Sequence, residues 1–386
     1  MANTLTNLYD VIHLALDVVS RELVGFIPAV MRDASADRAA IGDTISYPVV
    51  STFTPGSITA ASYGPAGSDM SAPAASASIT KAYSVPVYLT GEENKGLRNS
   101  GAYEAVMKNA FAQAMRALVN LIEVDLFTVG YTNSSRAYGT AGTAPFGTAS
   151  DLSDFAQAMK ILDDNGAPTS TRRLVLSTAA LANLRAKQSV PLASAGTEEI
   201  LRTGALGDLL GVRLGASGGI SAHTKGGGSG YLVDLTAGYA AGSTTIHLDT
   251  GTGTILAGDV LTNTVTARAD SNKYIVGTGG AGGEADYVLN SPGLKVAWVN
   301  NDTVSIGNSY TPNLLFSQDA IFLACRAPAV PDGGDAAADA MVVQDPVSGL
   351  PFEVREYRQY RRTVYEVAMA WGYSAIKDAH IATILG

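Results

Sequence analysis

One run of the sequence matches a nucleotide-binding template. Its glycines follow the spacing G-x-G-x-x-G, at Gly277, Gly279 and Gly282. The acidic residue Asp302 stands about twenty residues further on, where a dinucleotide-binding protein places its ribose ligand. In such a fold the last glycine opens a helix that binds the pyrophosphate, but the residues that follow here, GEADYVLNSPG, are strand-like and stop at a proline. We therefore interpret residues 277–283 as a mobile hairpin loop and Asp302 as a coincidence of spacing.

The other residues capable of chemistry form no catalytic or metal-binding pattern. The histidines lack the paired spacing of a zinc site and are scattered, at His13, His223, His247 and His380. Glu92 and Glu93 lie in TGEEN, where charge complementarity at a helix N-terminus or an intersubunit ion pair is a better interpretation than acid–base catalysis. ISAHTKGGGSG does not satisfy the phosphate-loop pattern, and no G-x-S-x-G motif occurs. The sequence thus predicts a protein that is not an enzyme, with no catalytic residue, no cofactor and no metal site.

The best candidate for nucleic-acid contact is REYRQYRR, in which aromatic residues lie between arginines. Between residues 352 and 366 the charged residues are Arg355, Arg358, Arg361 and Arg362 against Glu353, Glu356 and Glu366. Four positive charges minus three negative charges leave a net charge of +1, which is too small to follow a phosphate backbone. We expect these residues to form ion pairs with adjacent chains instead.

The composition favours a protein that associates with itself. The chain has 386 residues, enough for two domains or for one domain with an insertion, and 46% of them are hydrophobic. Only 16% are charged, against about 25% in ordinary globular proteins. A freely soluble monomer needs charges to cover its surface, so extensive self-association is predicted; a high content of Gly, Ala, Ser and Thr in loops is the alternative. The net charge of −9 argues against a surface that grips DNA nonspecifically.

Two further features concern the cell compartment. Cys325 is the only cysteine, which excludes an intrachain disulfide, and its place in AIFLAC predicts a buried thiol. The first residues, MANTLTNLYD, carry no basic segment, and no apolar run reaches the length of a membrane span. We therefore expect synthesis in a cytoplasm, with no signal peptide and no transmembrane segment.

Several elements can be predicted in the first half of the chain. An apolar stripe with steps of three and four residues predicts a helix, at Leu5, Leu8, Ile12, Leu16, Val19, Leu23 and Phe26. Residues 45–50 and 79–90 read as strands of an extended hairpin; a two-stranded arm is not stable by itself, and lying on another subunit would solve that problem. After the plausible N-caps Asn99 and Ser100, a second stripe predicts a helix of roughly 30 residues, about 45 Å long, that ends at Gly130. Its apolar positions are Met107, Phe111, Ala114, Leu118, Leu121 and Val124.

The second half alternates between mixed and purely strand-like character. Residues 152–162 and 181–188 read as helices, and RRLVLS, from Arg172, reads as a buried strand beside a second one, GVRLGAS. After the linker KGGGSG, seven short runs predict a small barrel or sandwich: YLVDL, TTIHLD, VLTNTVT, KYIV, DYVLN, LKVAWVN and DTVSI. In the tail, residues 352–373 alternate aromatic and other side chains and read as one long strand.

Three stretches together resemble the major capsid (coat) proteins of tailed bacteriophages. They are LDVVSRELVGFIPAVMRDAS, YEAVMKNAFAQAMRALVNLIEVDLF and TTIHLDTGTGTILAGDVLT. The sequence is most similar to the coat of short-tailed Salmonella phages, which carries an extra β-domain. The resemblance implies an α+β, Hong Kong 97-like capsid fold with an inserted all-β domain. Its expected parts are an N-terminal arm (1–43), an extended β-hairpin loop (44–91), a peripheral domain with a long spine helix (92–149), an axial domain (150–224), an inserted β-barrel-like domain (225–305), a continuation of the axial domain (306–340) and the peripheral strand with the C-terminus (341–386).

The resemblance also implies partners and a place in the virion. Such coats form hexamers and pentamers of one protein, assemble around a scaffolding protein and enclose double-stranded DNA that enters through a portal protein. Some relatives join a loop lysine to a neighbour's asparagine; Lys81 lies in the loop region, but no specific motif here supports crosslinking. The alternatives are the shell of an encapsulin-like protein compartment, a β-rich tail protein or adhesin, and a nucleotide-binding enzyme.

Overall fold

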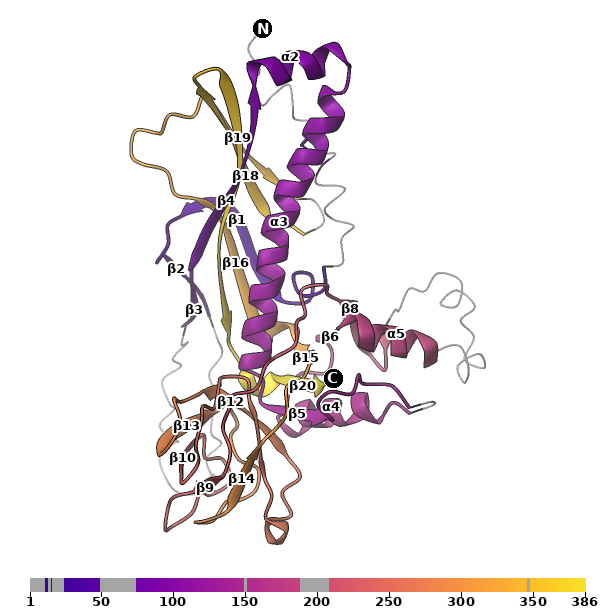
Figure 1. Cartoon of the computed structure of the whole chain (residues 1–386), viewed down its shortest axis with the longest axis vertical. Helices are drawn as coiled ribbons and strands as arrows, with labels where there is room; N and C mark the ends of the chain where they lie inside the picture. Colours follow the sequence, from indigo (N-terminus) through magenta and orange to yellow (C-terminus); the bar gives the residue numbers. More distant parts are fainter. Residues whose placement is uncertain are drawn as a thin grey trace, which may run out of the picture.

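The described molecule is elongated and mixed α+β, with more strand than helix (Figure 1). The computed structural model describes residues 11, 12, 15, 24–48, 74–148, 151–187, 208–345 and 348–386. Helix α2 (Gly91–Asn99) lies at one end. Helix α3 (Tyr103–Thr132) runs from it along the molecule toward the opposite end, which is built from short strands of residues 231–306.

The predicted long helix is present, but it begins after a separate short one. Thr90 is the N-cap of α2: its hydroxyl accepts a hydrogen bond from Glu93 N at 3.3 Å, and the Glu93 carboxylate accepts one from Thr90 N at 2.9 Å. The predicted helix N-terminal role of Glu93 is therefore confirmed. The prediction that Asn99 and Ser100 cap the long helix is wrong, because Asn99 ends α2 and Ser100 is its C-cap.

The buried face of α3 differs in detail from the predicted stripe. Leu121 and Val124 are 41% and 43% exposed, while Ile122 and Leu126 are buried in their place. Gly130 lies inside the helix rather than at its end. A Cβ at this position would lie 2.6 Å from Leu314 Cδ1, so the glycine allows close packing and is not a C-cap.

A six-stranded sheet lies beside α3. Its spatial order is β1 (Met31–Ala39), β16 (Ile321–Pro328), β19 (Arg362–Ala375), β18 (Pro351–Gln359) and β17 (Asp339–Gln344), with β4 (Lys81–Thr90) also paired to β19. The predicted single strand over residues 352–373 is wrong, since β18 and β19 form an antiparallel hairpin. The turn is Tyr360–Arg361, with Arg361 at φ 57°. It contains no Gly, Pro, Asn or Asp, so the sequence pattern does not mark it.

The predicted hairpin has a different partner in the structure. Strand β2 (Thr44–Pro48) pairs antiparallel with β3 (Ala74–Ser78), not with residues 79–90. The latter form β4, which packs Val85, Val87 and Leu89 against the main core and is therefore part of the body of this chain. The predicted strand residues 49 and 50 lie outside the described residues.

A second sheet and two helices form the side of the body nearest the C-terminus. Its strands are β5 (Arg136–Gly139), β20 (Ile381–Leu385), β15 (Pro312–Ser317), β6 (Arg172–Leu176), β8 (Val212–Ala216) and β7 (Asp208–Leu209), in spatial order. Helices α4 (Ser153–Asp164) and α5 (Thr178–Lys187) contribute to the core over it. The predicted helices near 152–162 and 181–188 and the predicted strands in RRLVLS and GVRLGAS are confirmed.

The short strands at the far end continue this sheet, because one of them, β12, pairs antiparallel with β5, and they close into a ring. In spatial order they are β11 (Val260–Asn263), β14 (Thr303–Ile306), β9 (Tyr231–Val233), β10 (Thr245–Asp249), β13 (Ala285–Leu289) and β12 (Lys273–Thr278), and β12 pairs again with β11. Every pair in this barrel is antiparallel. Six of the seven predicted runs are strands. LKVAWVN is not a strand: within it, Trp298 is buried and its backbone forms an isolated bridge with Tyr239. The boundaries 225–305 for an independent domain remain a prediction.

The N-terminal apolar stripe is described only in part. Val11, Ile12 and Ala15 are helical and buried in the main core, as is Phe26, which lies beyond the helix. The remaining stripe residues from Leu5 to Leu23 lie outside the described residues. The described residues also form three single-turn 3-10 helices: η3 (Thr266–Arg268), η4 (Gln318–Ala320) and η5 (Asp378–His380).

Candidate functional site

The glycine run does not form a nucleotide site. Residues 277–283 form the end of β12 and the turn that leads to β13, as predicted for a hairpin. Ile255 and Gly280 exchange backbone hydrogen bonds at 3.3 and 2.9 Å. A Cβ on Gly279 would lie 2.2 Å from the Ile255 carbonyl oxygen, and one on Gly282, at φ 105°, would lie 2.3 Å from that of Gly253. The glycines therefore allow this turn to pack closely on residues 253–256. The expectation of a mobile loop did not include these contacts.

Asp302 is a structural carboxylate. It is 3% exposed and accepts hydrogen bonds from Arg268 Nε, Asn263 Nδ2 and Val299 N, at 2.9, 2.9 and 2.8 Å. Burial opposes its ionisation, but these donors outweigh that effect and hold the pKa of Asp302 below its usual value. Its place after the glycine motif is therefore a coincidence, as the sequence indicated.

The structure does not bring the histidines together. His223 is buried, with its ring between those of Tyr131 and Tyr310 at centroid distances of 5.4 and 5.3 Å. His247 lies in the barrel, where hydrogen bonding to Asp286 raises its pKa. His380 lies in η5, where burial lowers its pKa. His13 lies outside the described residues.

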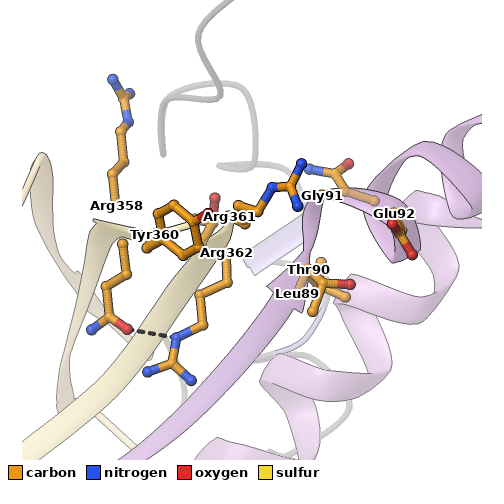
Figure 2. Close-up of a pocket in the computed structure, with 11 residues that line it drawn as sticks. Leu89, Thr90, Gly91, Glu92, Arg358, Tyr360, Arg361 and Arg362 are labelled. Atoms are coloured by element: carbon orange, nitrogen blue, oxygen red, sulfur yellow. Dashed lines mark hydrogen bonds between the residues drawn. The ribbon is translucent and has the colours of Figure 1, made fainter.

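The arginine-rich tail segment forms one wall of a pocket at the end of the elongated body. The pocket has a volume of about 730 Å³ and is lined by residues 89–92, 94 and 358–363. Figure 2 shows the Arg361 side chain extending toward Gly91 at the junction of β4 and α2, whereas the side chains of Arg358 and Arg362, on β18 and β19, point in other directions. The Arg361 carbonyl oxygen accepts a hydrogen bond from Gly91 N at 3.0 Å, which fixes the two walls together.

This pocket, with the residues around it, presents cations and aromatic rings outward. Tyr360 is 90% exposed at the turn, and Tyr88 is 61% exposed on β4. The Arg362 guanidinium lies 6.0 Å from the centroid of the Tyr88 ring, and its Nε donates to Gln359 Oε1 at 2.6 Å. Arginine and tyrosine are enriched in protein–protein interfaces. We name residues 88–94 and 358–363 the tip pocket.

Two of the other tail arginines form ion pairs within the chain. Arg355 Nε donates to Glu353 Oε1 at 2.9 Å, and Arg355 also pairs with Asp335. Arg358 Nε lies 3.2 Å from Glu356 Oε1. Arg355 is buried beside β17 and has both of its ion-pair partners within its own chain. The expectation of ion pairs with adjacent chains is therefore wrong for this residue.

Two buried carboxylates on α3 were not predicted to have a role. Glu123, 2% exposed, accepts hydrogen bonds from three consecutive backbone N–H groups, those of Gly25, Phe26 and Ile27, at 2.7–3.1 Å. The Ser217 hydroxyl donates to it at 2.6 Å. The sequence indicates this role only through the position of Glu123 in the apolar run VNLIEVDLF, because a charged side chain buried among apolar residues needs hydrogen-bond donors.

The second carboxylate, Asp125, fixes Lys81. Lys81 Nζ donates to Asp125 Oδ1 at 2.6 Å, and the Trp371 indole donates to Asp125 Oδ2 at 2.8 Å. The hydrogen bond to Asp125 raises the pKa of Lys81. Lys81 thus holds the base of β4 to α3 and to β19. This gives the loop lysine a structural role within its own chain.

Cys325 has the environment that its sequence context predicted. It is 1% exposed on β16, within the main core. Burial raises the pKa of its thiol to about 12. A thiol so protonated at neutral pH is a poor nucleophile, and we interpret it as a core side chain.

Asp378 carries the one raised carboxyl pKa among the described residues. Burial raises it to about 6, above the roughly 3.9 of an unfolded chain. The protonated form is therefore favoured by folding, and this stability is lost as the pH rises through the folded pKa. Replacing Asp378 by asparagine removes this ionisation, so the variant should be more stable by about 1–2 kcal/mol near pH 8, a value reduced because partial exposure screens the charge. Near pH 4 the substitution should change the stability by almost nothing. Urea unfolding at both pH values measures this; an equal effect at both would contradict it.

Among the described residues, no helix combines the length and the apolar character that a membrane span requires.

Comparison with known proteins gives matches among solved structures alone. No protein-family model and no curated protein matches the sequence. A structure from Mycobacterium phage Che8 shares 13% identity at a TM-score of 0.44, over 89% of this chain and 84% of that one. The capsid of cyanophage P-SCSP1u shares 9% identity at a TM-score of 0.46, over 92% and 86%. A virus-like particle from Pyrococcus furiosus shares 10% identity at a TM-score of 0.42, over 97% and 98%. Bacteriophage capsids are thus among the structures similar to this chain, at a level that assigns it no function.

Proposed function

We propose that this chain is a major capsid protein, the structural subunit of an icosahedral shell that encloses the double-stranded DNA of a tailed bacteriophage. The observation that carries the proposal is the long helix α3 lying along a sheet (Figure 1). The β18–β19 hairpin at the end of this sheet lines the tip pocket. Such a body is stiff and presents its contact groups at an extremity, which suits a subunit that meets neighbours edge to edge.

In this proposal the parts of the chain have the roles that the resemblance implies. Residues 1–43 are the N-terminal arm, whose strand β1 joins the main sheet. The extended loop is the part of 44–91 that precedes β4, because β4 belongs to the body of the chain. The peripheral domain comprises 92–149 and 341–386, and the axial domain comprises 150–224 and 306–340. Residues 225–305 are the inserted β-domain. The fold is then of the Hong Kong 97-like class.

The proposed partners follow from the same assignment. Copies of the chain form hexamers and pentamers, with a scaffolding protein and a portal protein as assembly partners. The net charge of −9 suits a wall that encloses DNA without binding its sequence. Each contact between copies can be weak, because a closed shell repeats it many times.

The tip pocket provides a test. Reversing two of its charges, in Arg361→Glu with Arg362→Glu, should reduce shell formation at least tenfold, because a loss of about 1.4 kcal/mol at one contact already changes its equilibrium constant tenfold. Sedimentation velocity of the chain co-expressed with a scaffolding protein measures the assembled fraction. Circular dichroism shows whether the variant is folded.

Arg361→Lys with Arg362→Lys is the matched control, since it keeps both charges at the same positions. It should assemble more than the double glutamate variant does. Normal assembly of the folded double glutamate variant would remove the tip pocket from the proposed interface.

A further inference from the structure

The outer face of the barrel gathers one histidine and several carboxylates. His247 lies on β10 between Ile246 and Leu248, which are fully buried in the barrel core, so its side chain is on the opposite face. Asp286 stands directly opposite His247 on β13. Asp234 follows the last residue of β9, and its N–H donates to the His247 carbonyl oxygen at 3.0 Å. Three adjacent strands thus place these side chains in one row.

The geometry around the imidazole is that of a metal ligand with its supporting carboxylate. Asp286 Oδ1 lies 2.6 Å from His247 Nδ1 and orients the ring; with the proton on Nδ1, the other nitrogen, Nε2, is the one available to a metal. Glu284 Oε1 lies 3.4 Å from Nε2. One ligand atom from each of Asp234, His247 and Glu284 lies within 4.8 Å of the other two.

The charge balance of this row favours a cation. Three carboxylates, those of Asp234, Glu284 and Asp286, surround a single imidazole. Within the described part of the chain, Glu284 and Asp286 each lie within ion-pair distance of His247, and none of the three carboxylates pairs with a lysine or an arginine. The side chains of Glu284 and Asp286 are 72% and 69% exposed, so an ion from solution can reach them. A bound divalent ion would offset the mutual repulsion of these carboxylates.

We propose that Asp234, His247 and Glu284 bind a divalent transition-metal ion of the Zn²⁺ class, with Asp286 orienting the histidine. One imidazole nitrogen with two carboxylates suits Zn²⁺, whereas Ca²⁺ and Mg²⁺ prefer oxygen ligands throughout. Ligand atoms around a tetrahedral zinc lie about 3.3 Å apart, given bonds of about 2.0 Å. The three ligand atoms start within 4.8 Å of one another, and the Glu284 side chain is 72% exposed, so it has room to rotate toward that separation.

The site has a mechanical consequence for the barrel. Glu284 directly follows the glycine loop 277–283, while His247 and Asp234 belong to β10 and the end of β9. A bound ion would tie the base of that loop to two neighbouring strands. This role does not depend on the proposed shell function, because the site lies within one barrel of one chain.

Isothermal titration calorimetry of the purified, metal-free full chain with Zn²⁺ tests the proposal. One ion per chain is expected, and Co²⁺ should give the visible absorption of a low-coordinate site. His247→Ala should abolish this binding, and Asp286→Asn should weaken it about 10–100-fold, as loss of a supporting carboxylate does elsewhere. Glu104→Gln, at an exposed carboxylate on α3 outside the tip pocket, is the matched control and should leave it unchanged.

If His247→Ala fails to fold by circular dichroism, Glu284→Gln carries the test, because this side chain is largely exposed. The proposal would be overturned if a folded His247→Ala or Glu284→Gln variant still bound one Zn²⁺ per chain with unchanged affinity. It would also be overturned if the unmodified chain bound no Zn²⁺. Neither result bears on shell assembly, which is measured separately.

Discussion

Replacing Glu123 by alanine is expected to lower the free energy of unfolding by about 3–5 kcal/mol, the usual cost of breaking a buried charged network by removing one partner. The carboxylate accepts from the N–H groups of three consecutive residues, 25–27, and from Ser217. Without it, these donors remain buried and unpaired, and each unpaired group costs about 1–3 kcal/mol. Because folded domains are stable by only about 5–15 kcal/mol, this one change removes a large part of the total.

Urea unfolding followed by circular dichroism measures the effect. Glu123→Gln keeps one carbonyl acceptor and should lose less stability than the alanine variant. Glu104→Ala removes an exposed carboxylate from the same helix and should change the free energy by less than about 0.5 kcal/mol. An alanine variant at position 123 as stable as the Glu104 control would show that this network does not fix the N-terminal segment.

Replacing Asp259 by alanine is expected to have an effect of similar size, about 3–5 kcal/mol, at the junction of the barrel and the body. Asp259 is 1% exposed and lies just before β11. It accepts from Gly226 N at 3.1 Å and from Leu256 N at 2.7 Å, and it lies 2.9 Å from His223 Nε2. His223 in turn exchanges backbone hydrogen bonds with Tyr310 of the body, so the carboxylate connects both parts.

The loss should be localised as well as large. Limited proteolysis should cut the Asp259→Ala variant between residues 223 and 231 faster than the unmodified chain, because the connection to the barrel is loosened there. Asp332→Ala, at an exposed carboxylate in another loop, is the control. If thermal unfolding and the cleavage pattern of the variant matched those of the control, Asp259 would not hold the junction.

The sequence predicts local elements well where a single periodicity persists. The apolar stripe that begins at Met107 predicts the long helix α3, and short runs of strand-forming residues between turn residues predict six barrel strands. It fails where the pattern continues through a change of direction. The aromatic alternation that continues to Tyr373 hides the turn at Tyr360–Arg361, and the stripe of α3 does not show that α2 ends first at Asn99.

Contacts between distant segments were beyond such patterns. Strand β4 looks like an arm by composition, yet β19 pairs with it along its whole length and the core covers Val85 and Val87. The tip pocket joins residues near position 90 to residues near position 360, so the arginines could be counted but not placed. The glycine run shows the converse: its spacing matched a motif, and only the facing carbonyls of Gly253 and Ile255 explain why glycine is required.

The central claim is that copies of this chain form a closed shell around DNA. Electron microscopy of the chain expressed in bacteria, with and without a scaffolding protein, tests it most directly. We expect closed, regular particles when scaffolding protein is present. Particles that contain an enzyme in place of DNA or scaffold would instead identify a protein compartment. Monomers or small oligomers under every condition would contradict the claim.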